Sequence, residues 1–431
     1  MPESPPEERP ILIETREELI FMLSEAAALE HMIMCGYLFA SFTLKDRPDE
    51  GLAPDQLAAV KRWGRVVSGV AAQEMLHLAL VNNLLISVGA APFFGRPNFP
   101  HPPKYFAPGI QLALLPFGEK ALRHFLYLER PERFELDDAP GFEAGAAAAP
   151  NTAGDGIVPE QQGFATVGHL YRGIEQGFVH MAEKLGERRL FVGSPRHQAT
   201  QEFFGWPELV AVTDVKSSGR ATESIITEGE GARGNWKNAH FGKFYQVLGE
   251  YIAMKKDDTN FEPARPSIPA AARRTPDARG MAQITDPLTA RVSDLFNASY
   301  ELALQLLSRF FTHSETSEAE QKALSDGAVA LMVNVLKPLG KELTRLPVGP
   351  RHPGLTAGPS FQMYPREYLL PHRHAAWVLL HERATELAKY CGDLSRDSAK
   401  LDLGSVRVAL DGLSSVLEPH ALAGQRAIES A

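Results

Sequence analysis

An apolar stretch of the sequence, SGVAAQEMLHLALVNNLL (residues 68–85), carries a carboxylate and an imidazole three residues apart, Glu74 and His77. Residues at this spacing lie on one face of an α-helix, so the two side chains would be neighbours. A buried carboxylate needs a partner charge, a hydrogen bond or a metal ion, because burying it alone is costly. The pair by itself indicates a metal site only weakly, since a buried Glu bonded to a core Tyr or Arg is more common.

A second apolar pattern, SEAAALEHMIMCGYLFA, places Glu30 about halfway along another expected helix. If the two helices are antiparallel neighbours, Glu30, Glu74 and His77 can face one point. A dinuclear carboxylate site in a four-helix bundle takes a Glu from each of two helices and a Glu-x-x-His pair from each of the other two. The pattern therefore predicts two further helices that carry ligands.

The third of these helices offers Glu175 in YRGIEQGFVHMAEKL, where apolar residues flank it. Taken alone, a solvated Glu is an equally good interpretation. His180 follows five residues later, about 140° around an ideal helix, and we expect it in an outer position or at the surface.

The fourth segment, ITEGEGARGNWKNAHFGKFYQVLGEY, offers Glu228, Glu230 and His240 but no strict Glu-x-x-His pair. The glycines between the Glu and the His predict that one helix ends and another begins there, with the insertion bulging outward. Both groups can then still converge. Of the two acids, the interpretation favours Glu230 over Glu228.

Carboxylates and imidazoles without thiolates suit iron or manganese. Four carboxylates balance two dications, so the sequence predicts two ions of iron or manganese per chain. Tyr37, two turns after Glu30, is a candidate catalytic residue as a redox-active or hydrogen-bonding neighbour, although a core Tyr with a satisfied hydroxyl is the more frequent case. The six expected ligands are Glu30, Glu74, His77, Glu175, Glu230 and His240.

The elements that must position these residues are predicted to be helices. A T-x-x-E capping box begins at Thr15, and the helical pattern continues through Leu44. Pro54 suits the first turn of the second helix, which continues to Val88, and Gly89 suits its C-terminal cap. The short connection makes the two helices antiparallel, as in a bundle.

Further helical patterns cover residues 119–128, 161–185, 213–227, 236–254, 287–311, 318–346, 374–391 and 405–417. The segments 91–117 and 347–361 are rich in Pro and Gly, and such irregular segments could shape a pocket. No convincing strand pattern occurs. We expect an all-α protein.

The domain organisation follows from these patterns. Residues 14–254 form a four-helix bundle with long irregular insertions, and residues 255–285, which are polar and rich in proline, form a linker or a surface wrap. We expect residues 286–417 to form a C-terminal helical extension packed on the bundle, and the patterns leave open whether these helices are a separate domain.

Composition excludes several classes of protein. The 431 residues carry a net charge of −9, which leaves no basic footprint for nucleic acid. Only two cysteines occur, which argues against a disulfide framework or a zinc ribbon. The N-terminal MPESPPEERP lacks the features of a signal peptide, and no uninterrupted apolar run reaches about 18 residues. We expect a cytoplasmic protein with neither nucleic acid nor membrane as partner.

Four segments, LEHMIMCGYLFASF, EMLHLALVNNLLISVGAAP, HLYRGIEQGF and IITEGEGA followed by HFGKF, resemble the ferritin-like domain of the iminophenyl-pyruvate dimer synthase family. Members of that family act in violacein-type and rebeccamycin-type bisindole biosynthesis. PLGKELTRLPVG, TAGPSFQMY and AAWVLLHERATELA resemble the extension that follows this domain, so the resemblance covers about residues 14 to 395. It implies a metal-binding ferritin-like bundle and an oxidase of amino-acid-derived imines. The bisindole enzymes are much longer chains, which puts the dimerisation reaction itself in doubt.

Three functions are consistent with these patterns. The favoured one is an oxidoreductase that uses O₂ or peroxide to oxidise a small organic substrate. An iron-storage or ferroxidase subunit ranks lower, because the insertions and the extension would obstruct the packing of a shell. The third is a non-catalytic bundle with a vestigial metal site. A homo-oligomer is left open.

Overall fold

The computed structural model describes residues 10–100, 111–132, 134–142, 157–231, 235–273, 281–312, 317–364, 372–398 and 401–430. The chain divides into two compact units. Unit 1 comprises residues 1–96, 101–198 and 207–264, and unit 2 comprises residues 97–100, 199–206 and 265–431. The last boundary between the units therefore falls within the expected linker of residues 255–285.

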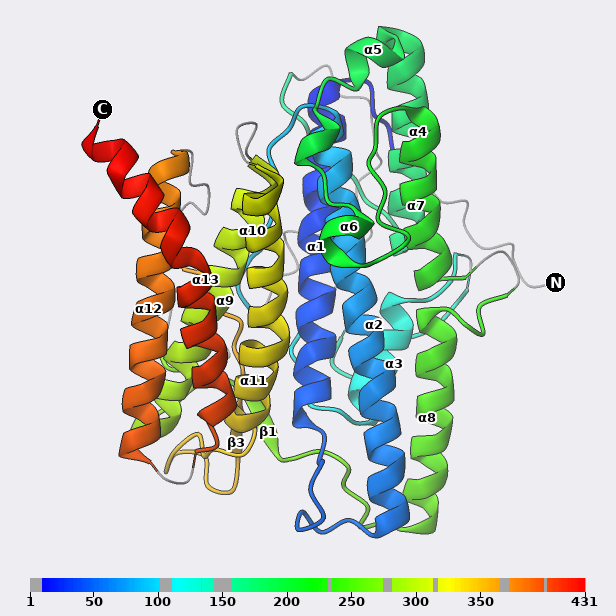
Figure 1. Ribbon diagram of the computed structural model, residues 1–431. Helices are drawn as coiled ribbons and strands as arrows, with labels where there is room; N and C mark the ends of the chain where they lie inside the picture. Colours follow the sequence, from blue (N-terminus) through cyan, green and yellow to red (C-terminus); the bar gives the residue numbers. More distant parts are fainter. Residues whose placement is uncertain are drawn as a thin grey trace, which may run out of the picture. The chain divides into compact units, whose positions relative to one another are not determined.

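Unit 1 is built on two long helices that pack along each other, α1 (Arg16–Thr43) and α2 (Pro54–Ser87) (Figure 1). The predicted capping box is present, since the backbone N–H of Glu18 donates to Oγ1 of Thr15 at 3.1 Å and the Glu18 carboxylate accepts from the Thr15 backbone. Pro54 occupies the first turn of α2, and Gly89 follows its end with a φ of +87°, a conformation that favours glycine. Both helices and their ends are confirmed to within about one residue.

Length and composition alone would allow α1 and α2 to cross a membrane. In each helix, however, 78% of the most apolar window is buried inside the protein. Burial of this kind is typical of the central helices of a bundle.

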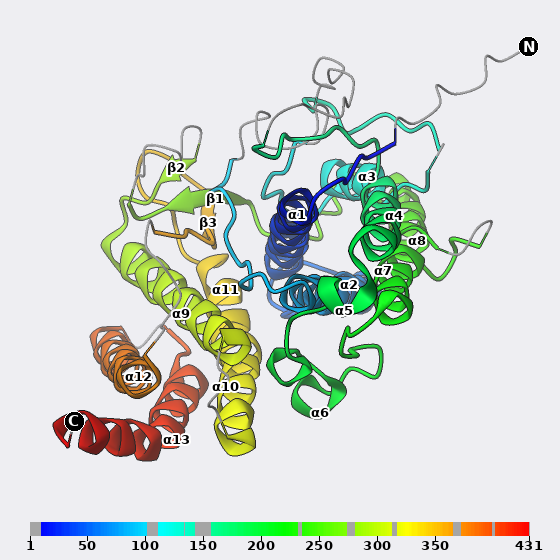
Figure 2. The same ribbon diagram turned by 90° about the horizontal axis from the view of Figure 1, so that it is seen from above.

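The other sides of this bundle are made of shorter helices. These are α3 (Glu119–Leu128), α4 (Val167–Leu185), α7 (Val215–Gly229) and α8 (His240–Asp257). α4 packs against α1 and α7, and α3 packs against α8. Both α7 and α8 contact α2 and lie along the same side of the bundle (Figures 1 and 2). That side is therefore one helix interrupted between Gly229 and His240, as the glycines predicted.

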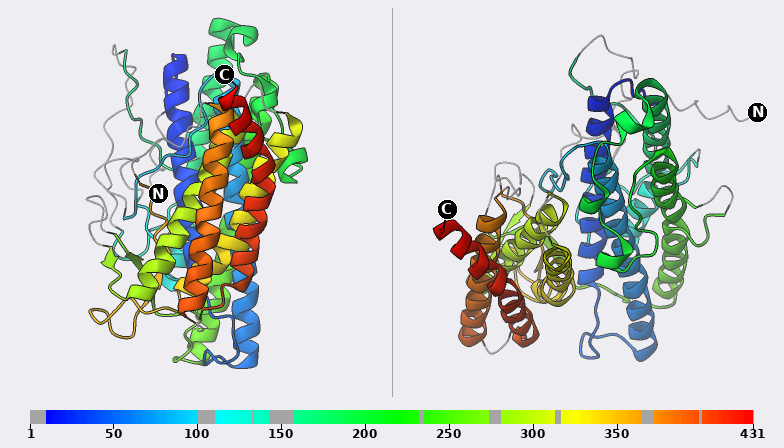
Figure 3. Two further views of the ribbon diagram at one scale, coloured as in Figure 1. Left: turned by 60° about the vertical axis from the view of Figure 1, so that its left-hand side comes forward. Right: turned by 45° about the horizontal axis from the view of Figure 1, so that its top comes forward.

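Unit 2 contains α9 (Pro287–Thr312), α10 (Glu318–Leu331), α12 (Arg373–Asp397) and α13 (Gly404–Glu429). α9 packs against α10 and α12, and α12 runs beside α13 (Figure 3). The helix expected over residues 318–346 contains a π-helical turn, η2 (Met332–Leu336), before α11 (Lys337–Leu343). The turn ends two residues before Pro338, which lacks the N–H that a regular helix requires. α13 continues through Pro419 and ends at Glu429, twelve residues past its expected end at Leu417.

A small parallel sheet also belongs to unit 2, with the strand order β2-β1-β3. Its strands are β1 (Ser267–Ala271), β2 (Ala282–Gln283) and β3 (Thr356–Gly358). Two of them lie within residues 255–285, where the sequence predicted no strand, because segments this short show no periodic pattern. The remaining short turns are α5 (Glu187–Leu190), η1 (Pro195–His197) and α6 (Gln201–Phe204). The all-α assignment is confirmed.

Candidate metal centre

Helices α1 and α2 bring three of the predicted ligands together. Nδ1 of His77 lies 2.9 Å from Oε2 of Glu74 and 3.7 Å from Oε2 of Glu30. None of these three residues is more than 2% exposed. The antiparallel register of the two long helices therefore places all three at one buried point.

His240, the first residue of α8, reaches the same point. Its Nδ1 lies 2.9 Å from Oε1 of Glu74, the oxygen that His77 does not contact. The two imidazole rings are 5.5 Å apart between centroids. The Glu74 carboxylate thus lies between two imidazoles and has one oxygen directed at each.

Glu129 joins the cluster although the sequence interpretation overlooked it. It is the C-terminal cap residue of α3, is 4% exposed, and its Oε2 lies 3.5 Å from Nδ1 of His240. A signal was present, because Glu129 continues the buried stripe of Leu122 and Phe125 at helical spacing. Glu129 lies one residue past the helix expected over residues 119–128, outside the pattern from which candidates were taken.

Glu228, and not the favoured Glu230, faces the cluster. Oε2 of Glu228 lies 3.3 Å from Nε2 of His77, and its side chain is 18% exposed. Glu230, the C-cap residue of α7, points elsewhere, because it lies two residues after Glu228 and two residues turn a side chain by about 200° around a helix. Its carboxylate accepts the backbone N–H of Gly168 at 2.8 Å, in the first turn of α4, where helix N-termini favour negative charge.

Glu175 is the other predicted ligand that the structure leaves outside the cluster. It is half-buried on the side of α4 that faces α7, close to Gly219 and Glu223, and burial raises its pKa with a further contribution from Glu223. One turn earlier, Tyr171 points inward instead, and its hydroxyl donates to Oε1 of Glu30 at 2.5 Å. The rotation of α4 therefore directs a Tyr, and not a Glu, at the cluster.

Among the described residues, the converging side chains form groups that could each hold a metal ion. In each group the donor atoms lie within 4.8 Å of one another. Donor atoms that share one ion are about 3 Å apart, because metal–ligand distances are about 2 Å. The groups are Glu30, Glu74 and His77; Glu74, Glu129 and His240; and His77, Glu228 and His240. The first two groups share Glu74, and the third shares His77 with the first and His240 with the second.

Two imidazole nitrogens provide a further test of this fit. Nε2 of His77 and Nδ1 of His240 are buried and make no hydrogen bond to any described residue. Carboxylate oxygens lie 3.3 and 2.9 Å away, so the atoms are near partners without hydrogen-bond geometry. No hydrogen bond holds either nitrogen, so each could give its lone pair to a metal ion.

The charges of the cluster also favour a cation. Burial raises the pKa of Glu30 to about 8, with a further contribution from Glu74. Burial favours neutral His240, but the carboxylates of Glu74 and Glu129 outweigh it and raise the pKa of His240 to about 9. Burial also opposes ionisation of Glu74, yet the adjacent His77 and His240 lower its pKa well below the ordinary range. The cluster therefore holds protons that a metal ion would replace.

Tyr37 lies beside the cluster, where its hydroxyl donates to Oε1 of Glu129. Burial raises its pKa well above the ordinary range, and the Glu129 charge adds to this effect. Its ring packs against Phe125 and Phe244 at centroid distances of 4.6 and 5.0 Å. Tyr37 is thus a core residue with a satisfied hydroxyl, and its role in catalysis stays a prediction.

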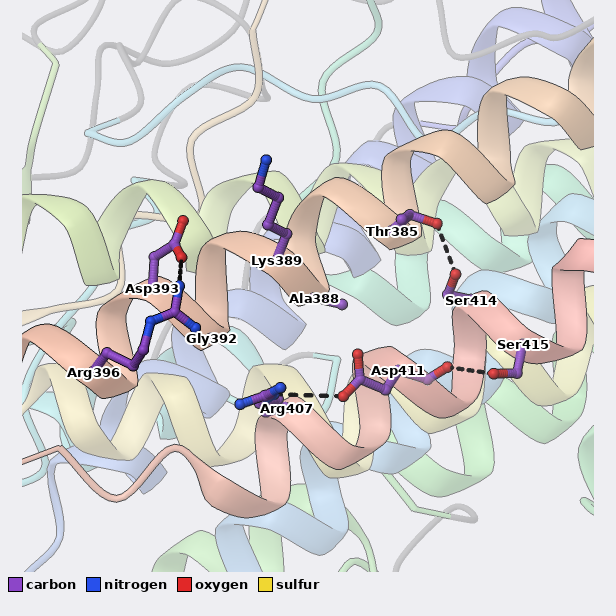
Figure 4. A pocket seen from close by; sticks show the side chains of 10 residues that line it. All are labelled: Thr385, Ala388, Lys389, Gly392, Asp393, Arg396, Arg407, Asp411, Ser414 and Ser415. Atoms are coloured by element: carbon purple, nitrogen blue, oxygen red, sulfur yellow. Dashed lines mark hydrogen bonds and ion pairs between the residues drawn. The ribbon is translucent and has the colours of Figure 1, made fainter.

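A separate polar cavity of about 390 Å³ lies in unit 2 between α12 and α13 (Figure 4). Its acidic residues are paired with arginines of their own helices, Asp393 with Arg396 and Asp411 with Arg407. We assign no ligand to this cavity.

The fold and the site define a class of protein, a helical bundle whose helices supply a buried cluster of carboxylates and imidazoles. A family model described as Ferritin-like matches residues 23–249, a range that contains the whole cluster. The chain belongs to this ferritin-like family.

Two curated proteins resemble most of the chain. Dichlorochromopyrrolate synthase of Lentzea aerocolonigenes is 26% identical over 424 residues, which cover 88% of this chain and 39% of the synthase. The 2-imino-3-(indol-3-yl)propanoate dimerase of Chromobacterium violaceum is 25% identical over 380 residues, which cover 83% of this chain and 35% of the dimerase. The predicted resemblance is confirmed, and the chain spans less than two fifths of the length of either relative.

A solved crystal structure of a ferritin-like protein from Caulobacter vibrioides is also similar. Its sequence is 16% identical, and the TM-score is 0.46. The match covers 73% of this chain and 96% of that one.

Proposed function

We propose that the protein is an oxidoreductase whose cluster binds two ions of iron or manganese. The observation that carries this proposal is the convergence of four carboxylates and two imidazoles, from several helices, at one buried point. Four ionised carboxylates balance two divalent ions when the imidazoles are neutral. The set contains no thiolate, and carboxylate with imidazole suits iron or manganese.

The proposed ligands divide into two halves. Glu30, Glu74 and His77 would hold one ion, and Glu74, Glu129 and His240 would hold the other. This division is supported by the two groups of donor atoms that share Glu74. Each half then has one terminal carboxylate and one imidazole of its own.

Glu228 completes the set and marks the side from which small molecules approach. Its side chain is 18% exposed, whereas the other five ligands are at most 5% exposed. Water or a substrate can therefore reach the cluster most directly beside Glu228, and we propose that the reacting molecules enter there.

Iron or manganese in such a centre supplies redox chemistry with O₂ or peroxide. The chain's own residues orient the ligands. Tyr171 donates to Glu30 and Tyr37 donates to Glu129, so each terminal carboxylate has one oxygen held by a buried hydroxyl. The burial of the cluster excludes bulk water and strengthens these interactions.

We propose a small amino-acid-derived compound as substrate. Support comes from the name of one relative, which describes a dimerase of 2-imino-3-(indol-3-yl)propanoate, an imino acid. Because the chain spans only 35% of that relative, the proposal extends to oxidation of such a compound and not to its dimerisation.

Elemental analysis tests the centre directly. We expect about two iron or manganese ions per chain after growth with both metals. The double variant Glu74→Ala/His77→Ala should lose them, with circular dichroism showing that it remains helical. Consumption of O₂ or peroxide is then measured with imino acids generated in situ. Absence of metal from both proteins, even after reconstitution with iron(II) or manganese(II), would contradict the proposal.

The same preparation separates the alternative in iron handling. A ferroxidase would oxidise iron(II) rapidly without any organic substrate, and a storage subunit would form a large hollow particle in light scattering. Either result would favour that alternative over the oxidation of a small substrate.

A further inference from the structure

Gln73, the residue before Glu74 in α2, contacts three groups on other helices. Its Nε2 donates to Oε2 of Glu228 at 2.8 Å. Its Oε1 accepts from Nζ of Lys243 at 2.7 Å and lies 3.3 Å from Nε2 of His240. A single amide on α2 therefore connects α7 with α8, across the interruption between them.

The partners themselves determine how this amide is oriented. A lysine ammonium can only donate, so the atom facing Lys243 is the amide oxygen. An ionised carboxylate can only accept, so the atom facing Glu228 is the amide nitrogen. The reverse orientation would bring two donors together on one side and two acceptors together on the other.

This orientation also determines the tautomer of His240. Since Oε1 of Gln73 can only accept, Nε2 of His240 must carry the proton. A neutral imidazole carries one proton, so the lone pair is on Nδ1. That nitrogen is the one that lies 2.9 Å from Glu74 and 3.5 Å from Glu129. Histidines that bind metals commonly donate their other N–H to a fixed acceptor in this way.

The contacts of Gln73 matter because the helix that carries Glu228 and His240 is interrupted between these two residues. In a continuous helix with Glu-x-x-His, the helix itself would fix the Glu relative to the His. Here Glu228 is near the end of α7 and His240 begins α8, so helical geometry does not fix one relative to the other.

We propose that Gln73 is a positioning residue that holds Glu228 and His240 in register and presents Nδ1 of His240 to the metal. Lys243 holds the amide in the orientation that this requires. The inference rests on the proposed metal centre and adds a determinant of its second half, the half formed by Glu129 and His240.

Metal titration provides the first test, with manganese(II) and zinc(II) as probes. We expect Gln73→Leu to lose about 10–100-fold in affinity for one of the two ions, a typical effect of removing a partner of a ligand. Gln73→Glu keeps an acceptor for His240 and Lys243 but loses the donor to Glu228, so it should restore only part of the affinity and keep the tautomer of His240. Gln56→Leu is the matched control, because Gln56 also lies on α2 but its amide contacts Asp258, and it should bind both ions normally.

Nitrogen NMR of the zinc-loaded protein, labelled with ¹⁵N-histidine, shows which ring nitrogen of His240 carries the proton and which binds zinc. A purely structural role of Gln73 would not change this assignment. We expect the His240 ring to show metal-bound Nδ1 and protonated Nε2 in the wild type and in Gln73→Glu. Zinc on Nε2, or unchanged affinity in Gln73→Leu, would overturn the role of Gln73 and leave the proposed function standing. A wild type that binds no zinc, manganese or iron would overturn both.

Discussion

Oε1 of Glu74 lies 2.9 Å from Nδ1 of His240, and this contact joins the middle of α2 to the first residue of α8. A short sequence motif fixes Glu74 relative to His77, but only tertiary structure brings His240 to the same carboxylate. One half of the centre is thus fixed within α2, and the other depends on how α8 packs against α2. Substitutions can therefore affect one half without the other.

The first prediction concerns stoichiometry. Glu129→Ala should reduce the metal content from about two ions to about one per chain, because only the His240 half contains Glu129. Glu175→Ala should leave the content unchanged, since Glu175 faces α7 and not the cluster. Elemental analysis of both purified variants measures this difference. Loss of metal from Glu175→Ala alone would reverse the assignment.

The second prediction uses two acids that are close in sequence. Glu228→Gln should weaken metal binding by about tenfold or more, because it removes the charge of a ligand. Glu230→Gln should bind metal normally, since an amide oxygen can still accept the N–H of Gly168. Calorimetric titration with manganese(II) compares the two variants. A larger loss in Glu230→Gln would show that the end of α7 is placed differently.

The long helices show which parts of the fold follow from sequence. Periodicity over many residues, a capping box at Thr15 and a proline at position 54 predicted α1 and α2 nearly to the residue. The short strands β1 and β2 carry no such pattern, and they form through pairing with each other rather than from local preference. Pairing with distant residues is not visible in a single segment.

The ligands of the site also divide into those that local sequence predicts and those that depend on tertiary structure. Glu30, Glu74 and His77 interrupt strongly apolar helices, so their burial could be predicted from neighbouring residues. The choice between Glu228 and Glu230 depended on where α7 ends, and each residue along a helix rotates a side chain by about 100°. Sequence patterns do not define helix ends that finely. That Glu30, Glu74 and His77 bind a metal remains part of the proposed function.

The third prediction concerns the pH dependence of metal binding. In the metal-free protein the carboxylates of Glu74 and Glu129 outweigh burial and raise the pKa of His240 from 6.5 to about 9. The imidazole must lose this proton to bind a metal, so binding releases a proton. The affinity for manganese(II) should therefore rise with pH between 6.5 and about 9 and then level off. Titration calorimetry in buffers of different ionisation enthalpy counts the protons released, and a count of zero would contradict the prediction.

The metal-free protein should show the opposite trend in stability. Because the folded-state pKa of His240 is raised, its contribution to stability is complete below pH 6.5 and is lost as the pH rises through about 9. Burial raises the pKa of Glu30 to about 8, which acts in the same direction. Thermal unfolding of protein treated with chelator should show a falling Tm across this range, and a rising Tm would contradict this linkage.

The fourth prediction concerns the start of α8, which sets the position of His240. A Cβ at Gly242 would lie 2.3 Å from the carbonyl oxygen of Trp236 and 2.4 Å from that of Lys237, both in the turn that precedes the helix. Backbone atoms yield less readily than side-chain tips, so Gly242→Ala should cost about 1–3 kcal/mol of unfolding free energy. It should also weaken metal binding, because the turn that begins α8 must shift.

Gly249 provides the matched control within the same helix, since a Cβ there would meet nothing within 4 Å. Gly249→Ala should stabilise the protein by about 0.5–1 kcal/mol, because alanine loses less conformational freedom in a helix, and it should leave metal binding unchanged. Urea unfolding of the metal-free variants and manganese(II) titration separate the two effects. If Gly242→Ala were as stable as Gly249→Ala and bound metal equally well, the position of His240 would not depend on the tight turn before α8.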